Sequence, residues 1–165
     1  MSRVQSDPPP PLRLVLDTNI WLDWLVFDDP GIVPIRTTVE AGGAEIFITE
    51  ACERELARVL GYPMRKTPLD AAAQAACLEQ CRRVARIHAA SVPVPGETGT
   101  GFPAVALPVC KDPDDQKFLE LARDCRANFL VTKDRDLLVF ARRKYQHLPF
   151  RIVTPRQFIG APAPE

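Results

Sequence analysis

The chain has 165 residues, of which 46% are hydrophobic and 25% are charged, a balance typical of a single globular domain. Its 21 basic and 21 acidic residues cancel, so the total charge does not indicate a nucleic-acid-binding protein. No apolar run reaches the roughly 18 residues that a membrane span needs, and nothing resembles a signal peptide, so we expect a cytoplasmic protein with no membrane partner.

The first half of the chain predicts alternating strands and helices. Residues 1–11 include four consecutive prolines and predict a disordered lead. Asp17 or Thr18 can cap the first helix, and Thr49 can cap the third. Gly42 and Gly43 end the second helix. The predicted elements are a strand over 12–16, helices over 18–27 and 32–41, a strand over 44–48, and helices over 49–60 and 69–90.

The second half repeats this alternation after a segment rich in proline and glycine. Residues 91–109 predict a surface loop, with a short strand near 105–109. The elements that follow are a helix over 114–126, a strand over 128–132, a helix over 134–145, a strand over 150–153, a helical turn over 155–159 and a tail over 161–165. Strands separated by helices predict a three-layer α/β/α fold with a mainly parallel central sheet over 12–160.

Four segments of the chain carry a carboxylate close to the end of a strand or the start of a helix. Asp17 and Asp134 directly follow strands, Glu55 lies on the helix after a strand, and Asp115 begins a helix. The carboxyl ends of parallel strands meet at one edge of a sheet, so we expect these acids to converge. Converging carboxylates repel one another unless a cation lies between them, and their hard oxygens suit Mg²⁺ or Mn²⁺. The pattern predicts metal-assisted hydrolysis of phosphodiesters.

The segments around these acids resemble the motifs of PIN domains, most closely the bacterial PIN proteins described as toxin components of toxin–antitoxin systems. The resemblance implies a metal-dependent ribonuclease with RNA as its substrate, an antitoxin protein as a partner and a homodimer as a candidate assembly. It also assigns the metal-binding and catalytic acids to Asp17, Glu55, Asp115 and Asp134. The matching segments are Leu16-Asp17-Thr18-Asn19, Ile48-Thr49 with Glu55-Leu56, Asp112 to Leu119, and Val131 to Leu138.

Other residues near the acids have weaker assignments. Thr18 and Asn19 either position substrate or form the turn, and Thr132 either orients Asp134 or is an ordinary strand residue. Asp136 caps the next helix or supports the ligands. Asp112 and Asp114 are explained by the helix start, where negative charge is favoured. The candidates for phosphate contact are Lys111, Lys133, Arg135, Arg142, Arg143 and Lys144.

Several alternatives stay open at this stage. Glu53 could replace Glu55 as the second acid, although we expect Glu50 and Glu53 to face solvent. Trp21, Trp24 and Phe27 could belong to the core or to an interface. His88, expected on the long helix, and His147 receive no catalytic role.

The cysteines give no sign of a structural cross-link, and two other functions are alternatives to the ribonuclease. Five cysteines without C-x-x-C spacing predict neither a disulfide framework nor a zinc site. One rival function is a non-catalytic PIN-like module that binds RNA or protein. The other is a phosphohydrolase that forms an aspartyl-phosphate on Asp17, which Asn19 disfavours because the dehalogenase type has a second aspartate at that position.

Overall fold

The computed structural model describes residues 7–63, 68–89 and 106–158 of the chain, and its centre is a five-stranded sheet. All the strand pairs are parallel, and the strand order is β3-β2-β1-β4-β5. The strands are β1 (Leu12–Leu16), β2 (Ala44–Ile48), β3 (Ala85–Ile87), β4 (Phe129–Val131) and β5 (Arg151–Val153).

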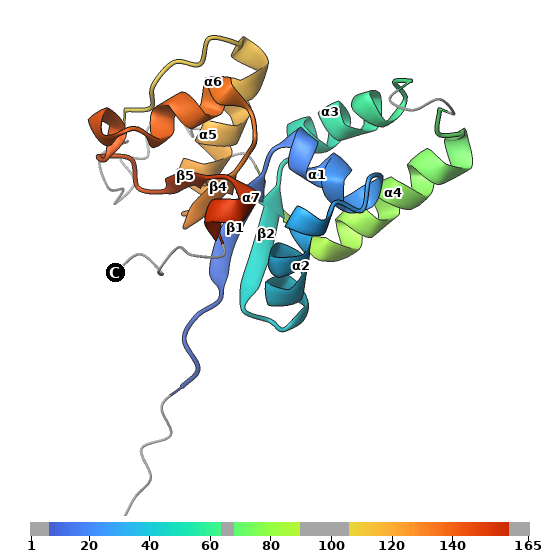
Figure 1. Cartoon of the computed structure of the whole chain (residues 1–165), viewed down its shortest axis with the longest axis horizontal. Helices are drawn as coiled ribbons and strands as arrows, with labels where there is room; N and C mark the ends of the chain where they lie inside the picture. Colours follow the sequence, from blue (N-terminus) through green and yellow to red (C-terminus); the bar gives the residue numbers. More distant parts are fainter. Residues whose placement is uncertain (1–6, 64–67, 90–105, 159–165) are drawn as a thin grey trace, which may run out of the picture.

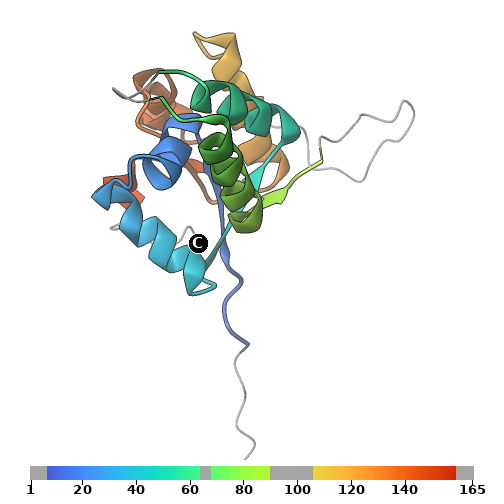
Figure 2. The same ribbon diagram turned by 90° about the vertical axis from the view of Figure 1, so that its right-hand side faces the viewer.

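Helices cover both faces of the sheet, which confirms the predicted three-layer α/β/α fold. Figure 1 shows α1, α2 and α4 on one side of the strands and α5 and α6 on the other, and Figure 2 shows α4 in front of the sheet. The helices are α1 (Thr18–Leu25), α2 (Val33–Glu40), α3 (Glu50–Leu60), α4 (Ala71–Val84), α5 (Gln116–Asp124), α6 (Arg135–Leu138) and α7 (Pro155–Phe158). Short 3₁₀ turns are η1 (Pro30–Ile32), η2 (Pro113–Asp115), η3 (Val139–Ala141) and η4 (Arg143–Tyr145).

The central strands are apolar along their length because helices cover them on both faces. Leu14, Val15 and Leu16 of β1 are buried, and so is every residue of β4. Strand β2 instead alternates buried and half-buried residues. Trp21 and Trp24 of α1 belong to this core, whereas the side chain of Phe27 is 39% exposed.

The order of the strands decides where a site can form. The chain moves outward from β1 through β2 to β3, then returns to the other side of β1 for β4 and β5. This reversal makes the carboxyl ends of β1 and β4 the switch point of the sheet, where parallel α/β proteins bind ligands. Asp17 follows β1 and Asp134 lies three residues after β4, so the fold brings both acids to that point.

The predicted helix over 69–90 is too long, because its last residues form a strand. Asp70 caps α4 through the backbone N–H of Ala73 at 2.7 Å, but the helix ends at Val84 and residues 85–87 form β3. The exposed edge of β2 supplies hydrogen-bond partners that outweigh the helix preference of the segment. His88 therefore follows a strand, and its backbone N–H donates to the carbonyl of Ile48 at 2.8 Å.

The predicted helix over 134–145 is also wrong in its second half. The α-helical part ends at Leu138, and two 3₁₀ turns follow, separated by Arg142 in an extended conformation with φ −69° and ψ 154°. This break lets Tyr145 fold back against Phe140, with ring centroids 5.0 Å apart and nearly perpendicular planes. Aromatic packing onto the core thus replaces continuation of the helix.

The short strand expected near 105–109 does not form in residues 106–109. The backbone there bonds to a side chain instead, since Gln116 donates to the carbonyl of Pro108 at 3.0 Å and accepts from the N–H of Cys110 at 2.8 Å. The expected lead over 1–6, the loop over 91–105, Ile159 and the tail over 161–165 lie outside the described residues. Residues 7–10 are exposed and have no regular secondary structure.

All five cysteines are free thiols, and all except Cys77 are buried. Within the described part of the chain, no helix is both long and apolar enough to span a membrane.

Candidate active site

Asp17 lies at the centre of the switch point, and its side chain is almost completely enclosed. The residue is 4% exposed. Its Oδ1 accepts the backbone N–H of Ile20 at 3.2 Å, which caps α1, and its Oδ2 accepts the hydroxyl of Thr132. Because each carboxylate oxygen has two lone pairs, the cap leaves further acceptor capacity on both oxygens.

Thr132 connects the two acids of the switch point. Its side chain is buried, and its Oγ1 donates to Asp17 and accepts the backbone N–H of Asp134 at 2.9 Å. Asp134 in turn caps α6, because its Oδ1 accepts the N–H of Asp136 at 2.9 Å. The expectation that Asp136 caps this helix was therefore wrong, and Thr132 has a positioning role that an ordinary strand residue lacks.

Glu55 faces the switch point from α3, but cationic and hydroxyl partners already hold it. The carboxylate is 13% exposed and accepts the hydroxyl of Thr18 and the ammonium of Lys117, the latter at 2.9 Å. Glu53 points elsewhere: it pairs with Arg82 of α4 and is only 16% exposed, so it does not face solvent as expected. Of these two acids, Glu55 is therefore the one beside the rim.

Asp115 approaches the rim from the turn that precedes α5. It occupies the cap position of α5 without making a side-chain capping bond, whereas Asp112 caps η2 through the N–H of Asp114 at 2.9 Å. Asp112 and Asp114 are exposed. Among the bonds that the structure shows, the Asp115 carboxylate has no structural role, and unlike Asp112 and Asp114 it is partly buried.

The charges of these residues act on one another. We call Asp17, Glu55, Asp115 and Asp134 the acidic rim. The pKa of Asp115 is raised to about 6, mostly by burial and then by the charges of Asp134, Asp112, Asp17 and Glu55, in that order. Burial also raises the pKa of Asp17 to about 6, against the lowering effect of its hydrogen bonds with Thr132 and the Ile20 N–H. Two neighbouring carboxyls with raised pKa values are typical of a functional site.

The other residues predicted to lie near the acids are Lys133, Asn19 and a set of basic residues. Lys133 forms an ion pair with the buried Asp23 of α1, so it is not free for phosphate contact. Asn19 is exposed, and its backbone N–H contributes to the hydrogen bonds that Asp17 receives. Exposed side chains belong to Lys111, Arg135, Arg142, Arg143 and Lys144.

The sequence interpretation gave no role to Lys117 or Asp23, although the position of each indicates a charged partner. Lys117 lies in the first turn of α5, where the helix dipole disfavours positive charge, so its position indicates a specific acidic partner. Asp23 lies among apolar residues of α1, where a carboxylate needs a partner to be buried. Their partners are Glu55 and Lys133, respectively.

The chemistry of the acidic rim suits a divalent cation. Asp17, Asp115 and Asp134 offer hard oxygen donors whose mutual repulsion a cation would relieve. In the described ranges, no group of three or more histidine, cysteine, aspartate or glutamate side chains is already arranged to hold a metal ion. The acids are close enough to interact electrostatically, and Glu55 has Lys117 as its counter-charge.

Comparison with known proteins gives one finding that bears on this site. The sequence model of one family, described as PIN domain, matches residues 13–136, which is more than half of the chain. The matched region contains the whole acidic rim. No curated protein matches the chain.

The raised pKa of Asp17 predicts a pH-dependent cost to folding. Folding raises the pKa of Asp17 from 3.8 to about 6, so the folded state binds the proton more tightly than the unfolded state does. This tighter binding stabilises the fold fully below pH 3.8, and the stabilisation is lost as the pH rises through about 6. Asp17→Asn should therefore raise the unfolding free energy by about 1 to 3 kcal/mol at pH 7.5 and by little at pH 4. Urea unfolding in the presence of a chelator measures both. An equal change at both pH values would contradict this account.

Proposed function

This chain belongs to the PIN domain family, a superfamily of nucleases, and from that premise we propose that it is a divalent-metal-dependent endoribonuclease. The observation that supports the proposal is the mutual charge effect among Asp17, Asp115 and Asp134, with raised pKa values at Asp17 and Asp115. Membership of the family supports hydrolysis of phosphodiesters in general. The choice of RNA rests on the resemblance of the four motifs.

We propose that Asp17, Asp115 and Asp134 hold Mg²⁺ or Mn²⁺. PIN nucleases typically use divalent metals, which agrees with these donors. Glu55 would join them only by exchanging Lys117 for the ion, since the two side chains are paired at 2.9 Å. When bound, a divalent cation activates water for attack on phosphorus and neutralises charge on the leaving oxygen.

The chain's own residues prepare the site for that reaction. Thr132 fixes Asp17 and the backbone of Asp134 in one arrangement, so the two acids need not reorganise independently. The apolar core around Asp17 excludes water from its far side, which strengthens electrostatic interactions within the rim. Lys117 places a positive charge beside the acids, where it neutralises Glu55.

A non-catalytic module that binds RNA or protein is the second candidate. The ion pair between Glu55 and Lys117 favours it, because this pair neutralises one of the four acids. An aspartyl-phosphate on Asp17 gains no support from the family match, and the 4% exposure of that residue leaves little access for a phosphoryl group.

Cleavage of RNA tests the catalytic proposal. With Mn²⁺ and a single-stranded RNA of mixed sequence, Asp115→Asn should reduce the cleavage rate by about a hundredfold or more, because it removes a ligand without breaking a hydrogen bond. The matched control is Asp114→Asn, an exposed acid one residue away, which should cleave like the wild type. If both variants cleave equally, or if the wild type cleaves no RNA, the catalytic proposal fails.

Binding of the metal can be measured without turnover. Mn²⁺ at a hundred times its dissociation constant should stabilise the wild type by about 2.7 kcal/mol, a rise in Tm of about 5 to 10 °C. Asp115→Asn should lose most of this rise while Asp114→Asn keeps it, in thermal unfolding with and without a chelator. An identical rise in both variants would place the ion elsewhere.

A role as the toxin of a toxin–antitoxin pair is a further proposal, supported by the resemblance of the motifs. It implies a partner antitoxin and allows a homodimer. Induced expression of the chain in a bacterial host should arrest growth, and Asp115→Asn should relieve the arrest while Asp114→Asn does not. Colony counts after induction measure this. Unimpaired growth with the soluble wild-type chain would argue against a toxin.

A further inference from the structure

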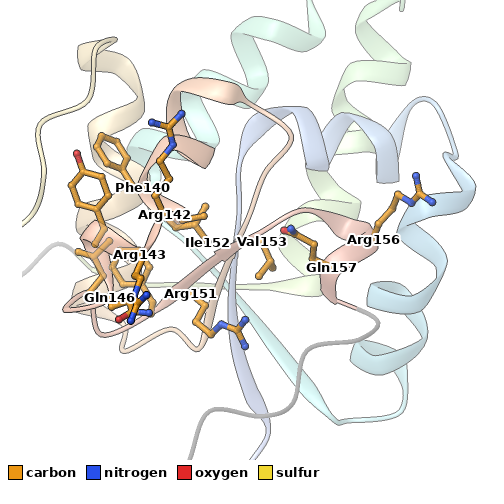
Figure 3. Close-up of a pocket in the computed structure, with 13 residues that line it drawn as sticks. Phe140, Arg142, Arg143, Gln146, Arg151, Ile152, Val153, Arg156 and Gln157 are labelled. Carbon is orange, nitrogen blue, oxygen red and sulfur yellow. The ribbon is translucent and has the colours of Figure 1, made fainter.

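A groove lined by arginines contains none of the four acids of the rim. It has a volume of about 930 Å³ and runs between the η3–η4 segment, β5 and the first turn of α7 (Figure 3). We call it the arginine groove and define it by Arg142, Arg143, Arg151 and Arg156. All four are exposed, and no aspartate or glutamate is among the described residues that line the groove.

These arginines differ from most others on the surface because they lack a carboxylate partner. Ion pairs hold Arg36, Arg54, Arg58, Arg82, Arg83, Arg86 and Arg123. In the part of the chain that the structure describes, the four arginines of the groove form no ion pair with an acid. The zero net charge of the chain therefore conceals a local excess of positive charge, which is the footprint of a polyanion site.

Aromatic and amide groups stand among the charges. Tyr145 is half-buried, lines the groove and packs edge-on against Phe140 at 5.0 Å, so its ring is held in place. Gln146 and Gln157 add exposed amides to the lining. Exposed arginines together with an aromatic ring match the way proteins bind single-stranded nucleic acid, in which bases stack and arginines contact phosphates.

One end of the groove adjoins the acidic rim. Val153, at the carboxyl end of β5, lines the groove, and its carbonyl accepts the backbone N–H of Thr132 at 2.9 Å. Thr132 is the residue that holds Asp17. The groove and the rim therefore lie at the adjacent carboxyl ends of β5 and β4.

We propose that the arginine groove binds the phosphodiester backbone of single-stranded RNA beside the site of cleavage. The identity of the bound strand rests on the proposed function, whereas the existence of an anion-binding groove rests on its charge and shape. Bidentate arginines recognise phosphate oxygens, and the ring of Tyr145 gives an unpaired base a surface to contact.

Binding without cleavage tests the groove. The probe is a fluorescein-labelled single-stranded RNA of 20 nucleotides, followed by fluorescence anisotropy with a chelator present. Arg143→Ala/Arg151→Ala should weaken binding about tenfold and reduce the slope of log K against log salt by about 1.4, since each phosphate contact contributes about 0.7. The control Arg83→Ala/Arg86→Ala removes the same charge from arginines paired with Glu79 and Glu45 and should bind like the wild type.

The outcomes separate this proposal from the catalytic one. Equal RNA binding by the groove variant and the wild type, with both folded by circular dichroism, overturns the groove. The proposal is also overturned if the wild type binds a labelled polyglutamate peptide more tightly than the RNA and the groove variant does not. The groove would then bind acidic protein. A wild type that binds RNA through the groove but does not cleave it with Mn²⁺ supports the groove and overturns the nuclease.

Discussion

The acidic rim depends on the hydroxyl of Thr132, which joins two segments that are 115 residues apart in sequence. Placing Asp17 in the core beside Asp134 costs free energy, because burial and like charge both disfavour ionised carboxylates. A donor from Thr132 and the N–H groups at the start of α1 offset part of this cost. The rest of this cost persists as the raised pKa values of Asp17 and Asp115.

The cost of gathering acids at the switch point also explains where basic residues lie around it. Acids gather where β1 and β4 end, and Lys117 and Lys133 each neutralise an acid close to that point. Among the described residues, many surface arginines are ion-paired, whereas Arg142, Arg143, Arg151 and Arg156 of the arginine groove are not. Acidic and basic surfaces lying side by side suit an enzyme that holds a cation at one place and a polyanion at the next.

The residues of the sheet and the rim show how far local patterns reach. Strands β1 and β2 were predicted to the residue because their apolar runs end sharply at Asp17 and Thr49. Strand β3 was missed because Ala85–Ile87 continues an alanine-rich helix in sequence and becomes a strand only where β2 offers an open edge. The break at Arg142 had no local signal either, since it follows from the packing of Tyr145 on Phe140. Likewise, Glu55 rather than Glu53 faces the rim because α3 packs against α4 through the pair of Glu53 with Arg82.

The sequence by itself indicated most of the alternation of strands and helices and the caps Asp17 and Thr49, and it predicted four acids near one edge of the sheet. These are local properties: hydrophobic period, capping side chains and strand ends are written in neighbouring residues. Only the tertiary structure decided that Thr132 donates to Asp17, that Lys117 pairs with Glu55 and that, among the described residues, the arginines of the groove have no acidic partner. Each of these depends on distances between segments far apart in the chain, which no local pattern encodes.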